Sequence, residues 1–308
     1  GEGGGEASLT YLPVTDRTVG TEEQMVVQIR SRRNDPPAAR DMALETYRDI
    51  PITGCFDAQD PEGEALTYTI INPPKRGGVE VREDGSFVYT PKENKKGRDY
   101  FGYKALDKEG NYSQEATVII RILKQKKAVV YADMKGSSDE YAAVVLSETG
   151  LYTGKQICGV YCFEPDARVT RGEFLSMCMA LTGKAPVTGI YRTGYLDDER
   201  IPAWQKAYAS AATIQGVYAG IPTDDGTVFS GDEAITCAEA AALLDRALEL
   251  EDVSYIAGYE HMDAALAQAC ANLNAYDVIP QHISEGQLLH RSDAARMLSA
   301  ALELINNR

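Results

Sequence analysis

The sequence has few of the residues that mark catalytic or metal centres. It contains three histidines in 308 residues, at positions 261, 282 and 290, and none joins a cluster with metal-ligand spacing. A nucleophile elbow, a phosphate-binding loop and a zinc-ligand pattern are missing as well. No pair of carboxylates stands out for acid–base chemistry. We therefore expect a protein that is not an enzyme and has no cofactor, apart from a calcium ion considered for the first half of the chain.

Cysteines are also few, with six in the chain. Cys178 and Cys270 fall on the apolar faces of predicted helices, where a small hydrophobic side chain is the ordinary interpretation. Cys158 and Cys162 flank a loop and are the best-placed pair for a disulfide, with free thiols as the alternative.

Positive charge is scarce, because 31 Lys and Arg residues face 46 Asp and Glu residues, giving a net charge of −15. This balance argues against nucleic acid as a partner. It also gives no long-range attraction for an anionic polymer, so capture of one would depend on local pockets around single arginines. No run of 18 apolar residues is present, which excludes a predicted membrane span. A secretory signal is absent too, as expected for a fragment or a mature chain.

The second half of the chain contains a repeated phrase. Phe163–Phe174 returns in looser form as Phe229–Glu239, and a third copy lies at Leu289–Asp293. Repeats of this kind indicate one supersecondary unit per copy, and each copy needs its neighbours to bury its apolar face. Apolar residues at helical spacing predict two helices joined by a loop in each copy. We expect three helical hairpins, over about residues 129–184, 193–250 and 253–308.

The second helix of a hairpin begins with a recognisable cap. Thr170 with Glu173, and Thr236 with Glu239, fit the capping box, in which the hydroxyl and the carboxylate each bond a free backbone amide. These four residues are therefore predicted structural caps. Arg171 is different, because a cation in the first helical turn opposes the helix dipole. It suits a bound carboxylate or phosphate, with a solvated surface arginine as the alternative.

These residues resemble the S-layer homology (SLH) domain, a three-motif module that holds proteins to bacterial cell walls. The family motif opens with an aromatic residue, any residue and Asp, followed by Trp, and it ends in Ile-Thr-Arg-Ala-Glu. The first copy matches at Tyr131–Asp133, Phe163–Pro165 and Val169–Glu173. The second matches at Tyr195–Asp197, Trp204, Phe229 and Ile235–Glu239, with Cys237 in place of the arginine. The third keeps Arg291 and Asp293 but has no clear partner for the opening Asp or the Trp.

The resemblance implies an all-α pseudo-threefold bundle of three SLH motifs over residues 129–308, with grooves between the motifs. In the family these grooves bind secondary cell-wall polysaccharide, which often ends in a pyruvate ketal on N-acetylmannosamine. A ketal carboxylate suits arginine, a sugar ring packs on Trp, and sugar hydroxyls can donate to Asp. The expected carbohydrate-binding residues are Asp133, Arg171, Asp197, Trp204 and Arg291. Core packing is the alternative for Trp204, and the groove at Cys237 is expected to be weak or silent.

The first half of the chain has a different pattern. Short alternating segments such as Leu66–Ile71, Ser86–Thr90 and Ala116–Ile122 are separated by turn clusters, which favours an antiparallel sandwich. Residues 35–123 resemble the Ig-like or cadherin-like tandem repeats of bacterial surface proteins. Residues 1–34 echo the end of that repeat and are predicted to be the tail of a preceding one. The expected fold class is thus multidomain, an all-β sandwich followed by an all-α bundle.

A cluster of acidic residues in the predicted sandwich raises the question of calcium. Asp57, Asp60 and Glu62 lie close together in the sequence. Their spacing is not that of an EF-hand loop, because the twelfth position counted from Asp57 is Tyr68 rather than Glu. A plain Asp-Pro-Glu-Gly turn is the alternative.

We expect a non-covalent anchor that holds an extracellular bacterial protein, of the S-layer type, to the cell wall, with the sandwich as its stalk. Its expected partner is secondary cell-wall polysaccharide. In a second hypothesis the chain is the C-terminal anchoring part of a surface enzyme whose active part lies upstream. In a third it belongs to an adhesin, whose Ig-like domain meets a host-cell or protein partner.

Overall fold

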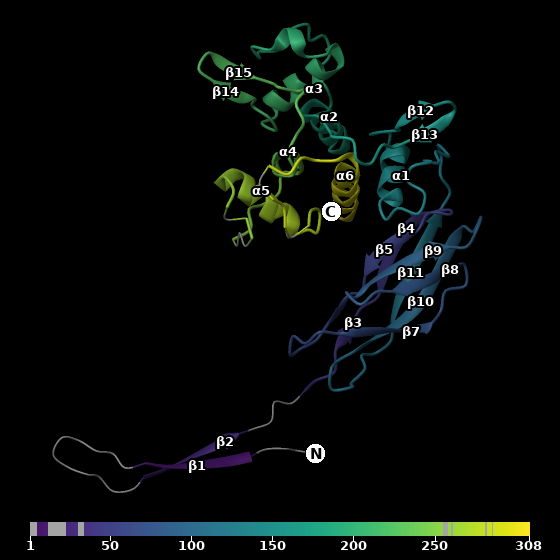
Figure 1. Ribbon diagram of the computed structural model, residues 1–308, viewed down its shortest axis with the longest axis vertical. Coiled ribbons are helices and arrows are strands. Elements are labelled where there is room, and N and C mark those ends of the chain that lie inside the picture. The colour runs from purple at the N-terminus through teal and green to yellow at the C-terminus, as the bar shows by residue number, and fades with distance from the viewer. Residues whose placement is uncertain are drawn as a thin grey trace, which may run out of the picture. The chain divides into compact units, whose positions relative to one another are not determined.

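The computed structural model describes the backbone of β1 (Gly5–Tyr11) and β2 (Glu23–Ile29), and residues 34–254, 258–259, 261–280, 282–284 and 286–308 (Figure 1). β1 and β2 pair antiparallel, with Gly5 opposite Ile29 and Tyr11 opposite Glu23. Apart from Asn34, the rest of the predicted 1–34 tail lies outside the described residues. The chain divides into two compact units, and Arg121–Arg308 lies within one of them.

Residues 34–124 form the predicted β-sandwich. One sheet has the order β4-β11-β10-β7 and the other has the order β5-β9-β8, with the short strands β3 and β6 paired beside them. The strands are β3 (Ala38–Ala39), β4 (Met42–Tyr47), β5 (Ile52–Cys55), β6 (Ala58–Gln59), β7 (Thr67–Asn72), β8 (Gly77–Val81), β9 (Ser86–Pro91), β10 (Gly97–Leu106) and β11 (Ala116–Leu123). Every second residue of β11 is buried, because neighbouring side chains of a strand point to opposite faces of the sheet.

The sandwich core is built around aromatic rings. The ring of Phe56 lies 4.6 Å from that of Tyr68, 4.7 Å from that of Phe87 and 4.5 Å from that of Tyr103, centroid to centroid. Tyr103 is fully buried, and its hydroxyl donates to the carbonyls of Arg40 (2.8 Å) and Asp57 (2.9 Å). The buried phenol therefore ties two connecting segments to the core and keeps its polar end satisfied.

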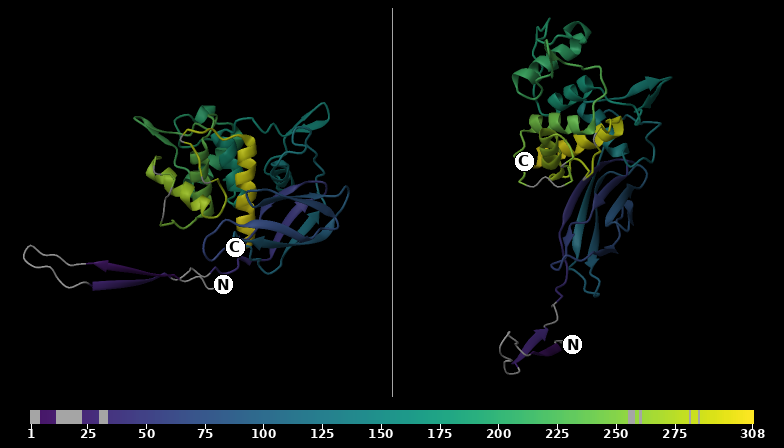
Figure 2. Two further views of the ribbon diagram at one scale, coloured as in Figure 1. Left: turned by 60° about the horizontal axis from the view of Figure 1, so that its bottom comes forward. Right: turned by 60° about the vertical axis from the view of Figure 1, so that its left-hand side comes forward.

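The C-terminal half is not all-α, so that expectation was wrong. Its helices are α1 (Glu140–Thr149), α2 (Arg171–Leu181), α3 (Ala203–Ile214), α4 (Cys237–Leu248), α5 (Ala264–Asn274) and α6 (Arg291–Asn307), with a 3-10 helix at Asp198–Arg200. Two β-hairpins lie among them, β12 (Lys155–Ile157) with β13 (Val160–Cys162), and β14 (Ile221–Thr223) with β15 (Gly226–Val228). This half is therefore mixed α/β, and α6, drawn in yellow in Figure 2, is the longest of its helices with 17 residues.

The hairpins replace what the sequence presents as loops. Each strand has only three residues, which is too short for an alternating pattern to be recognised. The first hairpin turns at Cys158 and Gly159, whose φ angles of 50° and 82° suit the tight turns that fit twisted strands. All six cysteines are free, so the Cys158–Cys162 disulfide is not formed. Register explains why, because Cys162 lies opposite Lys155 and Cys158 lies in the turn.

A closed ring of backbone hydrogen bonds joins the three repeats. The amide of Val169 donates to the carbonyl of Leu289 (3.1 Å), Leu289 donates to Ile235 (2.9 Å), and Ile235 donates back to Val169 (3.0 Å). All three residues are buried, at 2 % exposed or less. Each immediately precedes the cap of one helix, α2, α4 or α6, so the ring sets where the three helices begin.

A second set of bonds repeats the arrangement two residues further on. The amides of Arg171, Cys237 and Arg291 donate to the carbonyls of Glu233 (2.8 Å), Gln287 (2.8 Å) and Ala167 (2.9 Å), respectively. The free amides at each helix start are thus partly satisfied by the neighbouring repeat. Within the described residues, no helix combines the length and apolarity needed to cross a bilayer.

An ion pair fixes the beginning of α3. The Asp198 carboxylate accepts from Lys206 Nζ (2.7 Å) and from the amide and hydroxyl of Thr193 (2.6 and 2.7 Å). The hydrogen bond from Lys206, followed by those from Thr193, lowers the pKa of Asp198 well below its usual value. Lys206 lies one half-turn from Trp204, so this pair helps to hold the part of α3 that carries the tryptophan.

Acid should weaken the stabilisation that the Asp198–Lys206 ion pair provides. A carboxylate whose pKa is lowered by folding adds stability above its unfolded pKa of about 4, and that stability is lost as the pH falls through this value towards the folded one. Asp198→Asn should therefore be less stable than the wild type at neutral pH, and the difference should shrink as the pH falls below about 4. Denaturant titrations followed by Trp204 fluorescence can measure it. A difference that stays constant on acidification would contradict the assignment.

Candidate carbohydrate-binding site

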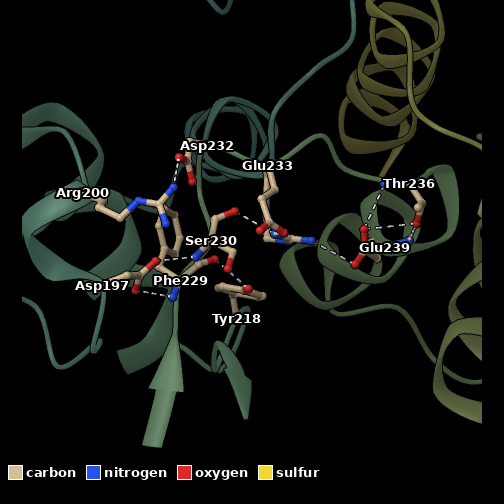
Figure 3. Close-up of polar contacts among 10 residues, drawn as sticks. Asp197, Arg200, Tyr218, Phe229, Ser230, Asp232, Glu233, Thr236 and Glu239 are labelled. Atoms are coloured by element: carbon tan, nitrogen blue, oxygen red, sulfur yellow. Dashed lines mark hydrogen bonds and ion pairs between the residues drawn. The ribbon is translucent and has the colours of Figure 1, made fainter. Parts of the chain in front are cut away.

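Two of the predicted site residues clamp loops. Asp133 accepts from the amides of Phe163 (2.9 Å) and Glu164 (2.7 Å), one through each carboxylate oxygen. Asp197 accepts in the same way from Phe229 (2.7 Å) and Ser230 (2.8 Å), as Figure 3 shows. The second residue of each clamped pair has a positive φ, 58° at Glu164 and 50° at Ser230, which favours glycine rather than these side chains. The two aspartates therefore stabilise strained loop conformations.

The third repeat has buried residues at the equivalent positions but lacks the aspartate that holds the loop in the other two repeats. Tyr259 is buried like Tyr131 and Tyr195, so His261 takes the position of the two aspartates. Ile283, which is 4 % exposed, takes the position of Phe163 and Phe229. The sequence pattern missed this match because neither replacement shares the chemistry of the residue it replaces.

Arg171 joins the first repeat to the second. Its Nη1 donates to the Ser230 carbonyl (2.7 Å) and its Nη2 to Glu239 Oε1 (3.1 Å), while Glu233 lies 3.8 Å away. The Arg171 side chain is only 6 % exposed. This explains a cation in the first turn of α2, where the helix dipole alone would disfavour it. The guanidinium is held by the chain itself rather than presented to an external carboxylate.

Arg291 joins the third repeat to the first in an equivalent way. Its Nη1 donates to the carbonyl of Phe163 (2.7 Å) and to Glu164 Oε2 (3.0 Å). Its guanidinium carbon lies 4.8 Å from the ring centroid of Tyr152, a cation–π contact. Nε and Nη2 of Arg291 have no partner among the described residues. Cys237 occupies the corresponding position in the second repeat, so the third link of this series is missing.

Arg291 also lines a groove, here called groove 1, with a volume of about 350 Å³. Three repeats contribute to it: the helices and loop of the first, α3 of the second and the start of α6 from the third. Trp204 is 53 % exposed on its wall. The lining residues are Leu146, Gly150, Leu151, Tyr152, Val169, Glu173, Ser176, Met177, Ala180, Trp204, Tyr208, Arg291 and Ala294.

The polar groups of groove 1 are partly committed to the fold. Glu173 Oε2 accepts from the Thr170 amide (3.0 Å), and Ser176 Oγ donates to the Gly172 carbonyl (2.7 Å). Glu173 Oε1 has no partner among the described residues. The groove is therefore lined by an exposed indole face, the Glu173 carboxylate and the guanidinium of Arg291, whose side chain is 10 % exposed.

The predicted caps are formed. In both capping boxes the threonine oxygen accepts from the glutamate amide and the glutamate carboxylate accepts from the threonine amide, for Thr170 with Glu173 and for Thr236 with Glu239. In the third repeat Asp293 Oδ2 accepts from the His290 amide (3.2 Å). Glu173 combines the cap with a place in groove 1, which the sequence alone did not indicate.

The predicted carbohydrate-binding residues thus separate into two groups. Trp204 and Arg291 meet in groove 1, whereas Asp133, Asp197 and Arg171 bind the chain's own loops. Tyr152 and Tyr208 on the groove wall were not predicted. Tyr152 lies in the loop after α1, between Gly150 and Gly154, a position that gives no pattern by itself.

The residues considered for calcium make turn contacts. Asp60 Oδ1 accepts from the amides of Glu62 (2.9 Å) and Glu64 (3.0 Å), and Asp57 lies 3.6 Å from Arg40. Asp60 Oδ2 is buried without a hydrogen-bond partner among the described residues, a feature that a cation would relieve. Within that part of the chain, however, no group of three or more His, Cys, Asp or Glu side chains could hold a metal ion. Calcium binding stays a prediction.

Comparison with known proteins identifies the sandwich. Residues 34–124 match the family model of the bacterial cadherin-like domain. The match favours a surface-associated protein. No curated protein matches the chain.

Similar solved structures share only part of the chain. The endo-fucoidan hydrolase MfFcnA9 of glycoside hydrolase family 107 is 16 % identical over 38 % of this chain, with a TM-score of 0.24. Human protocadherin-24 EC1-2 is 15 % identical, and the match covers 39 % of this chain and 66 % of that one, with a TM-score of 0.28. Surface layer protein SbsC, domains 4-9, is 13 % identical over 41 % of this chain and 19 % of that one, with a TM-score of 0.27. The chain spans only 22 % of the hydrolase, and TM-scores this low carry no argument about function.

Proposed function

We propose that residues 129–308 are a carbohydrate-binding anchor of the SLH type, which attaches a bacterial surface protein to secondary cell-wall polysaccharide. The observation that carries this proposal is groove 1, which is lined both by Trp204, with its exposed ring, and by the guanidinium of Arg291. An aromatic platform beside a few directed polar groups is the usual composition of a sugar site.

Each group would have a separate role. The apolar face of a sugar ring would pack on Trp204, while Glu173 Oε1 would accept from a ring hydroxyl. The unused nitrogens of Arg291 would donate to an acidic substituent such as a pyruvate ketal, because charge-assisted bonds to carboxylates are stronger than neutral ones. Arg291 thus takes the ligand-binding role that the sequence also assigned to Arg171.

The cadherin-like sandwich would then serve as a stalk between the wall and whatever the longer protein displays. Its match to a bacterial cadherin-like domain supports an extracellular location. The proposed role is binding rather than catalysis, with the polysaccharide as partner.

Isothermal titration of the full chain with purified wall polysaccharide, intact and with pyruvate removed, tests this function. Saturable binding that weakens when pyruvate is removed is the expected result. Equal binding of both polymers would discard the carboxylate contact, and no binding of either would discard the anchor.

Loss of the tryptophan should weaken glycan binding. Trp204→Ala removes the exposed platform of groove 1 and should raise the Kd for the polysaccharide by about tenfold, equivalent to about 1.4 kcal/mol. Tyr191→Ala is a matched control, because Tyr191 is 90 % exposed and does not line groove 1. Isothermal titration of both variants decides between a binding and a packing role. An unchanged Kd for Trp204→Ala would place the binding site elsewhere.

A further inference from the structure

A second groove in the C-terminal half resembles groove 1 in the helix positions of several of its lining residues. We call it groove 3, because residues of the third repeat form most of it, and its volume is about 450 Å³. Cys237 stands where groove 1 has Arg291, and Met297 stands where it has Met177, because each pair occupies the same place relative to its helix start. The lining residues are Cys237, Asn274, Asp277, Val278, Ile279, Pro280, Ile283, Gln287, Asp293, Arg296, Met297 and Ala300.

Groove 3 lacks both residues on which sugar binding in groove 1 depends. Cys237 supplies a thiol instead of a guanidinium, and burial raises the pKa of this thiol to about 11, so it is neutral. The position equivalent to Trp204 is Glu140 of α1, since both follow their opening tyrosines at equal spacing. Glu140 is 7 % exposed, accepts from the Gly136 amide (3.1 Å) and does not line the groove. Groove 3 therefore provides neither an aromatic ring nor a buried arginine for binding an acidic sugar.

The charges that remain in groove 3 are predominantly negative. Arg296, the basic residue of its lining, is held by Asp139 through Oδ1 (2.9 Å) and Oδ2 (3.1 Å), and by Asp293 Oδ1. Two carboxylates thus already neutralise this guanidinium. Asp277 is exposed at the groove, and its carboxylate has no partner among the described residues. The groove consequently retains an uncompensated negative charge.

The interior of groove 3 is largely apolar. Cys237 is only 4 % exposed, and its thiol has no hydrogen-bond partner among the described residues. Val278, Ile279 and Ile283 are buried beside it and supply an apolar wall. A cavity of this size with an apolar wall, an unpaired buried thiol and a free carboxylate at its margin suits a ligand with an ammonium group on a compact carbon frame.

We propose that groove 3 binds a ligand bearing a primary ammonium group, and specifically an amino sugar whose amine is not acetylated. The choice of a sugar rests on the proposed function, because groove 3 is the counterpart of groove 1. The ammonium group pairs with Asp277, and the carbon frame packs on the apolar wall. The two grooves of one module then select opposite charges, an acidic substituent in groove 1 and a basic one in groove 3.

Nuclear magnetic resonance titration of the full chain with glucosamine and with N-acetylglucosamine tests the proposal. Glucosamine should shift amides of Asn274–Val278 in a saturable manner, and N-acetylglucosamine, which has no charge, should bind more weakly by roughly fivefold, as expected for one partly exposed ion pair. Asp277→Asn should weaken glucosamine binding by a similar factor. Asp224→Asn, which changes an exposed acid outside groove 3, should have no effect.

Cys237→Arg gives an independent test, because it adds a positive charge to groove 3 and should abolish glucosamine binding. Equal affinity for the two sugars, absence of binding, or glucosamine binding that survives Asp277→Asn unchanged would overturn the proposal. Trp204→Ala separates this result from the proposed function, since it should weaken polysaccharide binding and leave the glucosamine shifts intact.

Discussion

Arg171→Ala should lower the free energy of unfolding of the C-terminal half by about 3 kcal/mol, because it removes a buried cation and leaves its partners unpaired. The Ser230 carbonyl loses its 2.7 Å bond, and the Glu239 carboxylate loses the 3.1 Å contact. The chain has one tryptophan, Trp204, so denaturant unfolding followed by its fluorescence reports on this half and not on the sandwich. The effect on stability should be far larger than any direct effect on glycan binding.

Arg200→Ala is the matched control for this measurement. Arg200 pairs with Asp232 (2.9 Å) in the same loop region, but its side chain is 72 % exposed, so its loss should cost less than about 1 kcal/mol. Arg291→Ala should both destabilise the fold and weaken polysaccharide binding, since its guanidinium lines groove 1. If Arg171→Ala were as stable as Arg200→Ala, or if folded Arg171→Ala lost binding while Arg291→Ala kept it, the assignment of the two arginines would be wrong.

Asp197→Ala should destabilise the same half by a comparable amount, about 3 kcal/mol, because two charge-assisted hydrogen bonds are lost together. The amides of Phe229 and Ser230 would lose their acceptor, and the left-handed backbone of Ser230 would lose its support. The same loop supplies the carbonyl that Arg171 binds, so the two substitutions should not be additive.

The double variant Arg171→Ala with Asp197→Ala measures this coupling by the same fluorescence titration. Asp225→Ala serves as control, since Asp225 is exposed in the β14–β15 turn and should change stability by less than about 0.5 kcal/mol. A small effect of Asp197→Ala, close to that of the control, would mean that the loop keeps its shape without the clamp.

Local patterns in the sequence were sufficient for the caps and for most elements. Thr170 and Thr236 are followed by glutamate at the spacing that a capping box requires, and this geometry depends on four consecutive residues only. The strands of the sandwich could be predicted because buried and exposed residues alternate along them. The match of residues 34–124 to a bacterial cadherin-like domain agrees with that prediction. What depends on neighbouring residues could therefore be predicted.

The roles of the arginines could not be predicted in this way. Arg171 and Arg291 each stand directly after a helix cap, so the local sequence does not separate their roles. Their contacts with residues 59 and 128 positions away show that both bind a loop and that Arg291 also lines groove 1. Groove 1 itself combines residues of all three repeats, so no single copy contains its pattern. The two β-hairpins could not be predicted for a different reason, because strands of three residues depend on pairing that a linear pattern does not show.

The cyclic contact through Val169, Ile235 and Leu289 has a mechanical consequence. Tension arriving along the chain at the first repeat passes not only to its sequence neighbour but directly to the last repeat, through the bond from Val169 to Leu289. Because each repeat is bonded to both others, we expect that the repeats do not separate one after another. A pull should instead meet all three at once, so rupture under force should occur as a single event.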